Sequence, residues 1–424
     1  MLTTLAAPAF ADTWCIENGN ITVKAGDTKG TNKVSQGSII DKVDTNTVIT
    51  NNNKNTASSN TVTIEAKDKD DKVEVKLDNV NIDTSKQNKA AVSVTGSGDT
   101  TIELDGDNKL KSGSAHAGLE HNKTDTSGEL TIQDKDKNGS LEAVGGFKGA
   151  GIGSAGSNDA QVKITGGNIT ATSDDWGAGI GSGSDGTAYV EITGGEINAT
   201  GGYLGAGIGG GCNGSGNVTI SGGTITAAGG EGAAGIGGGY YNGATVTITG
   251  DAVIKNASNT KYGAGIGGGY GYDGDVTISG NAKIENATGG YGAAGIGGGA
   301  FASPDKIGNG TVVIKDNAEI DNVQGGAYGA GIGGGKGVYL ASDKKIHGGD
   351  GKVTITGGKI TATSKSFGAG IGGGSNGSGD VTIEGNTEVN AAGGTGGAGI
   401  GSGAGDAKAN ITLEGKVTIV AKAG

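Results

Sequence analysis

Seven aromatic residues stand four or five positions before a repeated isoleucine, and they are the side chains best suited to chemistry in this chain of 424 residues. An aromatic ring has an apolar face and a polar edge, which suits contact with a sugar ring and equally suits stacking on another ring. We predict these seven as carbohydrate-binding residues, and a structural ladder of stacked rings is the alternative. They are Phe147, Trp176, Tyr203, Tyr262, Tyr291, Tyr328 and Phe367.

A second group of aromatics follows the same isoleucines and slightly favours the binding interpretation. A ladder that only closes a corner of the fold does not require rings on both sides of the motif. The second group consists of Tyr240, Tyr241, Tyr270, Tyr272 and Phe301.

The isoleucines belong to a motif, Gly-Ala-Gly-Ile-Gly-Gly-Gly at residues 205–211, that recurs nearly unchanged through most of the chain. The spacings between successive copies are 28, 28, 28, 30, 30, 36, 39 and 29 residues. A period in this range is typical of a repeat architecture. The central residues are Ile152, Ile180, Ile208, Ile236, Ile266, Ile296, Ile332, Ile371 and Ile400.

Each repeat predicts three short strands separated by turns. In the copy at 205–227, Ala206 and Ile208 have the same parity and point to one side of a strand. Val218 and Ile220 do the same in the next strand, and Ile225 does so in the third. With neither helical periodicity nor long strands, this pattern predicts an all-β, right-handed parallel β-helix with coils of about 28–30 residues, most regular at 146–405.

The glycines of the motif allow two interpretations. Gly205, Gly207 and Gly209 have the opposite parity to the isoleucine, so they point away from it. In one interpretation they permit tight coil geometry or close packing of another segment. In the other they leave a strip without side chains, on which a polymer or a flat sheet could lie.

The N-terminal part is less regular and predicts three divisions of the chain. Residues 1–11 end in Ala9-Phe10-Ala11, a pattern typical of a signal-peptidase site, so we interpret them as a signal-peptide remnant of a secreted protein. Residues 12–85 are predicted to be an N-terminal capping β region, in which 45–60 is a loop. Residues 86–424 are predicted to be the β-helix repeat domain.

Composition argues against several classes of partner. The net charge is −12 and no arginine occurs, which opposes nucleic-acid binding. No other stretch approaches the ~20 apolar residues of a membrane span. The two cysteines, Cys15 and Cys212, are expected to be unpaired and to bind no metal. No cofactor is predicted, although structural Ca²⁺ in the turns stays open.

Catalytic groups are not evident from the repeats. Asp174 and Asp175 are the densest acidic pair of the regular region, and the three histidines are dispersed. The longer repeats, at 301–310 and 336–350, are the places where an inserted site could lie, and surface turns are the simpler interpretation. We expect no enzyme, but a polysaccharide lyase or glycoside hydrolase stays open.

The Gly-Ala-Gly-Ile-Gly-Gly-Gly copies, followed by Val-Thr-Ile-Ser-Gly-Gly-Thr-Ile-Thr-Ala at 218–227, resemble the repeats of secreted bacterial cell-surface proteins of adhesin-like or carbohydrate-binding type. The resemblance covers about residues 115–420 and implies a right-handed parallel β-helix. It implies a non-catalytic protein of the cell surface that binds a polysaccharide or a host or cell-wall glycan. A structural spacer or stalk is the alternative, and the oligomeric state stays open.

Overall fold

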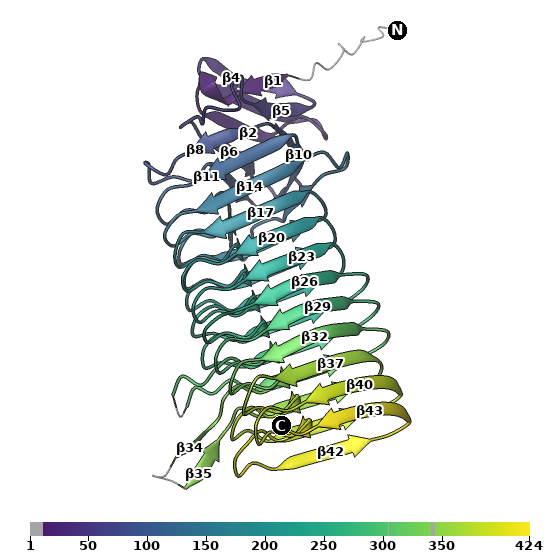
Figure 1. Ribbon diagram of the computed structural model, residues 1–424. Coiled ribbons are helices and arrows are strands. Elements are labelled where there is room, and N and C mark those ends of the chain that lie inside the picture. The colour runs from purple at the N-terminus through teal and green to yellow at the C-terminus, as the bar shows by residue number, and fades with distance from the viewer. Residues whose placement is uncertain (1–11, 304, 341–343) are drawn as a thin grey trace.

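The computed structural model describes residues 12–303, 305–340 and 344–424, so the predicted signal-peptide remnant at 1–11 lies outside the described residues. The chain forms a parallel β-solenoid that winds from the N-terminal end to the C-terminal end of one elongated body (Figure 1). One sheet of 12 strands contains one strand from each turn. The predicted β-helix class is therefore confirmed, with three strands in each regular coil.

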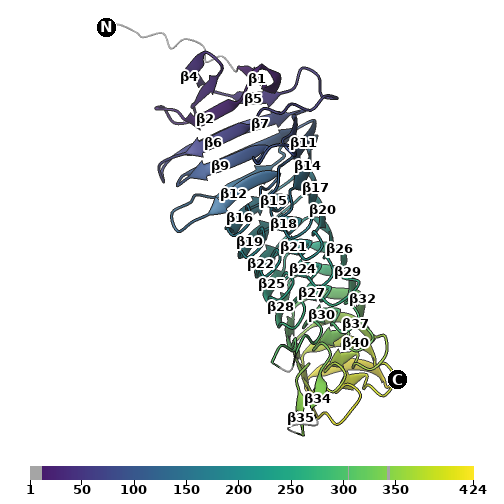
Figure 2. The ribbon, with the colours of Figure 1, turned by 90° about the vertical axis from the view of Figure 1, so that its left-hand side faces the viewer.

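Nine coils repeat the same three strands; Figure 1 labels the third strands, and Figure 2 labels the first strands from β15 to β30. The first strands are two-residue Ile-Gly pairs: β15 (Ile152–Gly153), β18 (Ile180–Gly181), β21 (Ile208–Gly209), β24 (Ile236–Gly237), β27 (Ile266–Gly267), β30 (Ile296–Gly297), β33 (Ile332–Gly333), β38 (Ile371–Gly372) and β41 (Ile400–Gly401). The second strands are β16 (Asp159–Ile164), β19 (Ala188–Ile192), β22 (Gly216–Ile220), β25 (Ala244–Ile248), β28 (Gly274–Ile278), β31 (Gly310–Ile314), β36 (Gly351–Ile355), β39 (Gly379–Ile383) and β42 (Ala409–Leu413).

The third strands form the sheet of 12 and run the full length of the stack. They are β8 (Asn81–Asp83), β11 (Asp107–Lys111), β14 (Ser140–Gly145), β17 (Asn168–Ser173), β20 (Glu196–Thr200), β23 (Thr224–Ala228), β26 (Val253–Ser258), β29 (Lys283–Thr288), β32 (Glu319–Gly325), β37 (Gly358–Ser364), β40 (Asn386–Ala392) and β43 (Lys416–Lys422).

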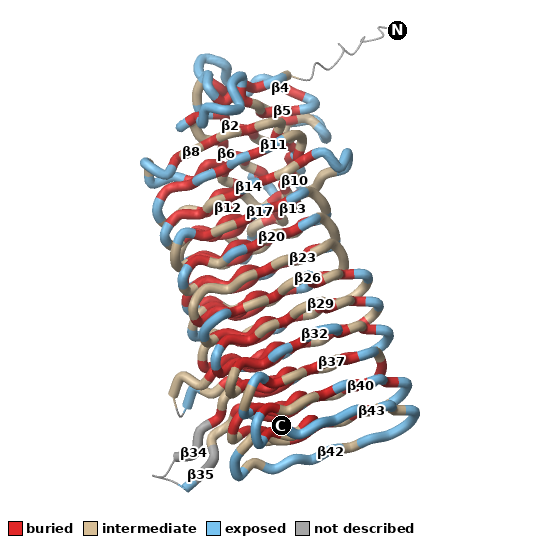
Figure 3. Tube along the Cα trace, viewed as in Figure 1, coloured by how far each residue is buried: buried red, intermediate tan, exposed pale blue. Residues whose placement is uncertain are grey.

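Ladders of identical residues form the core. Ile208 pairs in register with Ile180 on one side and with Ile236 on the other. Val218 and Ile220 also pair with the same residue types one coil away. These side chains are buried, and Figure 3 shows the buried positions alternating with accessible ones along the strands. Burial of each isoleucine contributes about 1.5–3 kcal/mol, which offsets the conformational entropy lost by ordering a glycine-rich chain.

The glycines of the motif pack against backbone and leave no bare strip. Gly205, Gly207 and Gly209 are all buried. A Cβ atom on Gly207 would lie 2.7 Å from the nitrogen of Ala228, at the end of the third strand β23. A Cβ atom on Gly209 would lie 1.9 Å from the carbonyl oxygen of Gly237 in the next coil. The structure thus decides for the packing interpretation, because other backbone segments cover the side of the motif that faces away from the isoleucine.

The N-terminal part is a wider version of the same solenoid with an antiparallel meander at its start. The stacks of first and second strands both continue into this N-terminal part. In addition, β3 pairs in antiparallel fashion with β2 and with β4. The elements are β1 (Thr13–Cys15), a 3-10 helix (Ile16–Asn18), β2 (Ile21–Ala25), β3 (Asn32–Gln36), β4 (Ile39–Asp44), β5 (Thr47–Thr50), β6 (Val62–Ala66), β7 (Lys72–Asp78), β9 (Val92–Gly96), β10 (Asp99–Asp105), β12 (Leu119–Lys123) and β13 (Leu130–Gln133).

The predicted loop at 45–60 is wrong in part, because β5 lies within it. Thr47 and Ile49 are buried, and β5 pairs in parallel with β1 and with β7. The predicted division at residue 85 stays a prediction. Strands β6, β7 and β8 already stack on the coil that follows them, through β9, β10 and β11.

One insertion and the cysteines complete the description. The long repeat at 336–350 contains an antiparallel hairpin of β34 (Val338–Leu340) and β35 (Lys345–His347). Cys15 and Cys212 are buried and unpaired, as predicted. None of the described residues belongs to a helix with the length and hydrophobicity of a membrane span.

Candidate functional site

The seven predicted aromatics, here called the aromatic strip, lie in the segments that connect each third strand to the next first strand. Backbone hydrogen bonds between coils set their spacing. The N–H of Trp176 donates to the carbonyl of Phe147 at 2.8 Å, and the N–H of Tyr328 donates to that of Tyr291 at 3.2 Å. The coil-to-coil hydrogen bonding that stacks the strands therefore stacks these rings as well.

All seven side chains of the aromatic strip are accessible to solvent. Tyr203 and Tyr291 are the most exposed, at 55% and 52%, followed by Phe147 and Phe367. Trp176, Tyr262 and Tyr328 are half-buried. No loop buries any of these seven residues, so their ring surfaces are available to a ligand.

The aromatic strip is interrupted rather than continuous. Ring centroids of Phe147 and Trp176 are 4.8 Å apart at one end. At the other end Tyr328 lies 5.0 Å from Tyr291 and 5.1 Å from Phe367. Between these groups the coil after Tyr203 carries Glu231 instead of a ring. Two short ring stacks are thus separated by a polar segment.

Glu231 makes the interruption a charged one. The ammonium of Lys261 lies 2.8 Å from the Glu231 carboxylate. Hydrogen bonds from Lys261 and Tyr203 lower the pKa of Glu231 below its usual value, so it stays ionised. The same carboxylate raises the pKa of the Tyr203 hydroxyl. The centre of the strip therefore presents one exposed ring beside a fixed ion pair.

A tyrosine cluster extends the strip sideways at Tyr262. We use this name for Tyr240, Tyr241, Tyr262 and Tyr270, of which the first, second and fourth lie in loops between first and second strands. Tyr270 lies 4.8 Å from Tyr262, 5.5 Å from Tyr240 and 5.7 Å from Tyr241, centroid to centroid. Burial, together with the hydrogen bond to Tyr241, raises the pKa of Tyr240, so its hydroxyl stays protonated.

Tyr241 occupies a backbone conformation that tyrosine rarely adopts. Its φ is +62°, in the left-handed region. Equivalent positions in other coils, five residues after the isoleucine, carry residues that tolerate this conformation better. Strain of about 1–3 kcal/mol at such a position is typical of functional sites. The other residues are Ser157, Asp185, Asn213 and Asn376, with φ of +64°, +63°, +57° and +59°.

A hollow of about 480 Å³ lies beside Tyr241. Its lining combines ring surface with amide, hydroxyl and ammonium groups, which is the mixture expected for a sugar site. The repeats contained the signal for Tyr241, since most other coils have Asn, Asp, Ser or Gly at this position and one has Phe301. The lining residues are Asn213, Tyr241, Asn242, Tyr272, Ala302, Ser303 and Lys306.

Lysines accompany the rings, and the sequence analysis missed them. Each is positioned by a different loop, so no repeat pattern reveals them. A lysine over a ring contributes about 0.5–1 kcal/mol at an exposed site and adds a hydrogen-bond donor. The nitrogen-to-centroid distances are 5.1 Å for Lys148 and Trp176, 4.6 Å for Lys336 and Tyr328, and 4.2 Å for Lys306 and Tyr272.

Two of the histidines make hydrogen bonds, one within its own coil and one to the next coil. His116 Nδ1 lies 2.8 Å from Glu120 Oε2, and this hydrogen bond raises the pKa of His116. His121 Nδ1 lies 3.0 Å from the carbonyl oxygen of Gln161, and burial lowers the pKa of His121. Within the described part of the chain, no three His, Cys, Asp or Glu side chains come together as ligands for a metal ion.

Cys212 lies next to the aromatic strip, and the ionisation of its thiol makes the stability of this region depend on pH. Its N–H donates to the Trp176 carbonyl at 2.7 Å. Burial, aided by the charges of Asp185 and Asp175, raises the pKa of the thiol to about 11 from the usual 9.0. The folded protein therefore keeps the Cys212 proton over a pH range in which the unfolded chain loses it.

We predict that the free energy of unfolding falls between about pH 9 and pH 11 by up to about 1.4 kcal/mol per pH unit because of this thiol. The sign follows from the proton count, since the unfolded chain binds one proton fewer there. Urea unfolding at half-unit pH steps should show a steeper loss in the native chain than in Cys212→Ala, and the difference between the two profiles is the contribution of this thiol. Parallel pH profiles for the two proteins contradict the prediction.

Comparison with known families agrees with the coil description. The beta helix repeat family matches five segments, each beginning in a second strand and ending just after the first strand of the next coil. No curated protein and no solved structure matches the chain. The matched residues are 162–184, 190–212, 218–240, 276–300 and 353–375. These matches and the parallel β-solenoid agree that the chain contains beta helix repeats and has a β-helix fold.

Proposed function

We propose that this chain is a non-catalytic, extracellular β-helix protein that binds a polysaccharide along the aromatic strip, as an adhesin or carbohydrate-binding protein of a bacterial surface does. The observation that carries the proposal is the accessibility of all seven strip residues. Rings exposed in a row along a rigid solenoid suit a polymer better than a single small ligand. The location outside the cell rests on the sequence Ala9-Phe10-Ala11.

The tyrosine cluster and its hollow support the same function. The hollow contains the ring of Tyr241, which is 42% exposed, and the amides of Asn213 and Asn242. Amide groups hydrogen-bond to sugar hydroxyls, while a ring covers the apolar face of the sugar. His121 is buried and contacts the carbonyl oxygen of Gln161 in the next coil, which supports the non-catalytic part of the proposal.

A structural spacer is the second candidate, and the ring-to-ring contacts favour it. Phe147 contacts Trp176, and Tyr328 contacts both Tyr291 and Phe367. Such contacts stabilise neighbouring coils by about 0.5–1.5 kcal/mol per pair without any ligand. Tyr203 distinguishes the two candidate functions. It is exposed and lies between the two ring stacks, so ring-to-ring contacts within those stacks do not account for it.

Retention of the chain on insoluble polysaccharides tests the proposal. We expect at least one of cellulose, chitin, xylan, mannan and peptidoglycan to retain the native protein. Trp176→Ala and Tyr203→Ala should each weaken retention at least about threefold, because each removes a ring surface. Lys359→Ala, an exposed change on the third-strand sheet, is the matched control and should leave retention unchanged.

Two outcomes contradict the proposal. If none of the five polysaccharides retains the native chain, a spacer is the better description. If a polysaccharide is retained equally by the native chain, Trp176→Ala and Tyr203→Ala, binding takes place away from the aromatic strip.

A further inference from the structure

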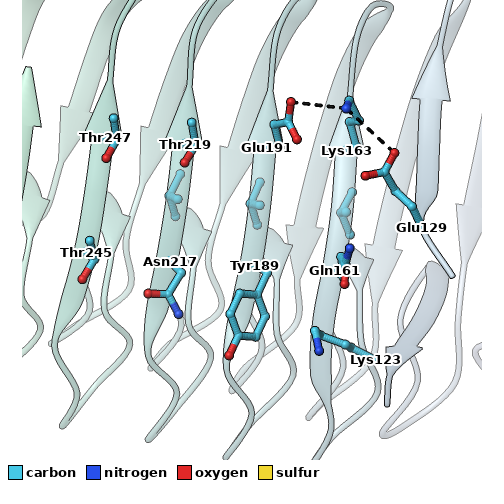
Figure 4. Close-up of a pocket in the computed structure, with 13 residues that line it drawn as sticks. Lys123, Glu129, Gln161, Lys163, Tyr189, Glu191, Asn217, Thr219, Thr245 and Thr247 are labelled. Carbon is cyan, nitrogen blue, oxygen red and sulfur yellow. Dashed lines mark ion pairs between the residues drawn. The ribbon is translucent and has the colours of Figure 1, made fainter. Parts of the chain in front are cut away.

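A second hollow lies on a different surface, the outer face of the second-strand stack. Its volume is about 360 Å³, and Figure 4 shows the side chains that line it. The strands β16, β19, β22 and β25 form its floor. One outward column crosses the floor in register, namely Gln161, Tyr189, Asn217 and Thr245. We call it the Tyr189 hollow.

The hollow exists because the solenoid changes width at this point. The N-terminal first strands β6, β9 and β12 have five residues, whereas β15 and later ones have two. The end of β12 turns over the second-strand stack, where Asn122 and Lys123 pair in antiparallel fashion with Ala160 and Asp159 of β16. Figure 2 shows the wide N-terminal coils projecting beyond the narrower ones. The projecting coils form a wall at the N-terminal end of the outer face of the second-strand stack.

Tyr189 is the one aromatic residue in its column, and its side chain is not part of the hydrophobic core. Its inward neighbours Val190 and Ile192 are buried, while Tyr189 itself is 41% exposed. Asn217 and Thr245, the next two residues of the column, are shorter than tyrosine, so they leave the ring standing above the floor. The other later members are Asp275, Thr311, Lys352, Asp380 and Asn410.

The charges around the Tyr189 hollow cancel. Lys163 Nζ lies 3.3 Å from Glu191 and 3.9 Å from Glu129, as the dashed lines in Figure 4 mark. The ammonium of Lys123 lies 5.1 Å from the centroid of the Tyr189 ring. Two lysines thus balance two glutamates among the lining residues. A balanced lining favours a neutral ligand, because an ionised one would face an equal number of repulsive charges.

The uncharged groups of the lining match the hydroxyls of a sugar. Gln161 and Asn217 provide amide donors and acceptors, and Thr219, Thr245 and Thr247 provide hydroxyls. A pyranose has one apolar face for the ring and several hydroxyls around its edge. The volume of about 360 Å³ suits a small ligand and lies near the lower end of ligand pockets in general.

We propose that the Tyr189 hollow is a separate binding site for one neutral pyranose residue. The sugar packs on the Tyr189 ring, and the amides of Gln161 and Asn217 hold its hydroxyls. This site shares no residue with the aromatic strip or the tyrosine cluster, so it does not depend on the function proposed for them.

Ligand-detected NMR with methyl glycosides of glucose, galactose, mannose and N-acetylglucosamine tests this site. We expect at least one to bind the native chain and to bind Tyr189→Thr about fivefold more weakly. Threonine occurs in the same column at Thr245, so this change should not unfold the sheet. Lys359→Ala, an exposed change on the third-strand sheet, should leave the affinity unchanged.

Three results overturn the inference. The first is that none of the four methyl glycosides binds, and the second is that Tyr189→Thr binds them as tightly as the native chain. The third is that methyl glucuronide binds as tightly as methyl glucoside, which removes the neutral specificity. Failure of the aromatic strip is distinguishable, because it shows in polysaccharide retention by Trp176→Ala and Tyr203→Ala and not in this measurement.

Discussion

Replacing Gly209 with alanine is expected to lower the free energy of unfolding of the surrounding coils by about 2–6 kcal/mol. Gly209 has φ +134°, which an L side chain rarely adopts, and this strain accounts for about 1–3 kcal/mol of the loss. The rest comes from the new Cβ atom, which would lie 1.9 Å from the carbonyl oxygen of Gly237. Relief of that overlap requires separation of two coils whose isoleucines are stacked.

Gly19 provides a matched control for the backbone strain. Its φ is +133°, but a Cβ atom there meets nothing within 4 Å. Gly19→Ala should therefore cost only about 1–3 kcal/mol. The difference between the two variants isolates the cost of the close coil-to-coil approach.

Hydrogen exchange is the measurement that suits a solenoid, because coils can open locally while the rest stays folded. In Gly209→Ala the amides of Ile208 and Gly210, which donate to Gly235 and Gly237, should lose protection. Equal loss of stability in Gly209→Ala and Gly19→Ala, each measured at its own coil, contradicts a packing role for the motif glycines.

Tyr241→Asn is expected to weaken polysaccharide retention about thirtyfold without lowering the melting temperature. An exposed ring within a cluster is a typical binding hot spot, whose loss costs about 2 kcal/mol or more. Tyr241 contacts the rings of Tyr240 and Tyr270 and lines the adjacent hollow. The stability should hold because asparagine occurs at the equivalent positions 213 and 376 with nearly the same φ.

Tyr241→Asn distinguishes an effect on polysaccharide retention from an effect on stability. Alanine substitutions within a group of contacting rings change both quantities together. The relief of backbone strain at residue 241 offsets the lost contacts with Tyr240 and Tyr270, so polysaccharide retention and stability are expected to change independently. Parallel thermal unfolding and retention measurements on the native chain, Tyr241→Asn and Lys359→Ala provide the comparison. A lower melting temperature with unchanged retention makes Tyr241 a structural residue and removes the tyrosine cluster from the proposed site.

The two proposed binding surfaces differ in the ligand that each can hold. The aromatic strip runs along several coils and presents rings at coil spacing, which suits a chain of sugars. The Tyr189 hollow is bounded at one end by the projection of β12 and contains a single ring. A chain able to use both surfaces would hold a polymer along one face and a single sugar residue on another.

Residue order alone determined the coil and its register. Ile208 recurs at a nearly constant spacing, and Val218 and Ile220 alternate with polar residues, so stacking identical positions is the arrangement that buries every branched side chain. The wide separation of Cys15 and Cys212 along such a stack already excluded a disulfide. Local periodicity was informative because each coil contacts only its neighbours.

Only the tertiary structure decided what covers each surface. The missing side chain at Gly207 is compatible with a bare strip and with a close approach of another segment. The structure shows the close approach, because the backbone of Ala228 lies directly against Gly207. The separation of the aromatic strip into two groups of contacting rings depends on distances between rings of different coils. The Tyr189 hollow depends on the antiparallel pairing of Lys123 with Asp159. Such contacts join segments from different repeats, and periodicity within one repeat carries no information about them.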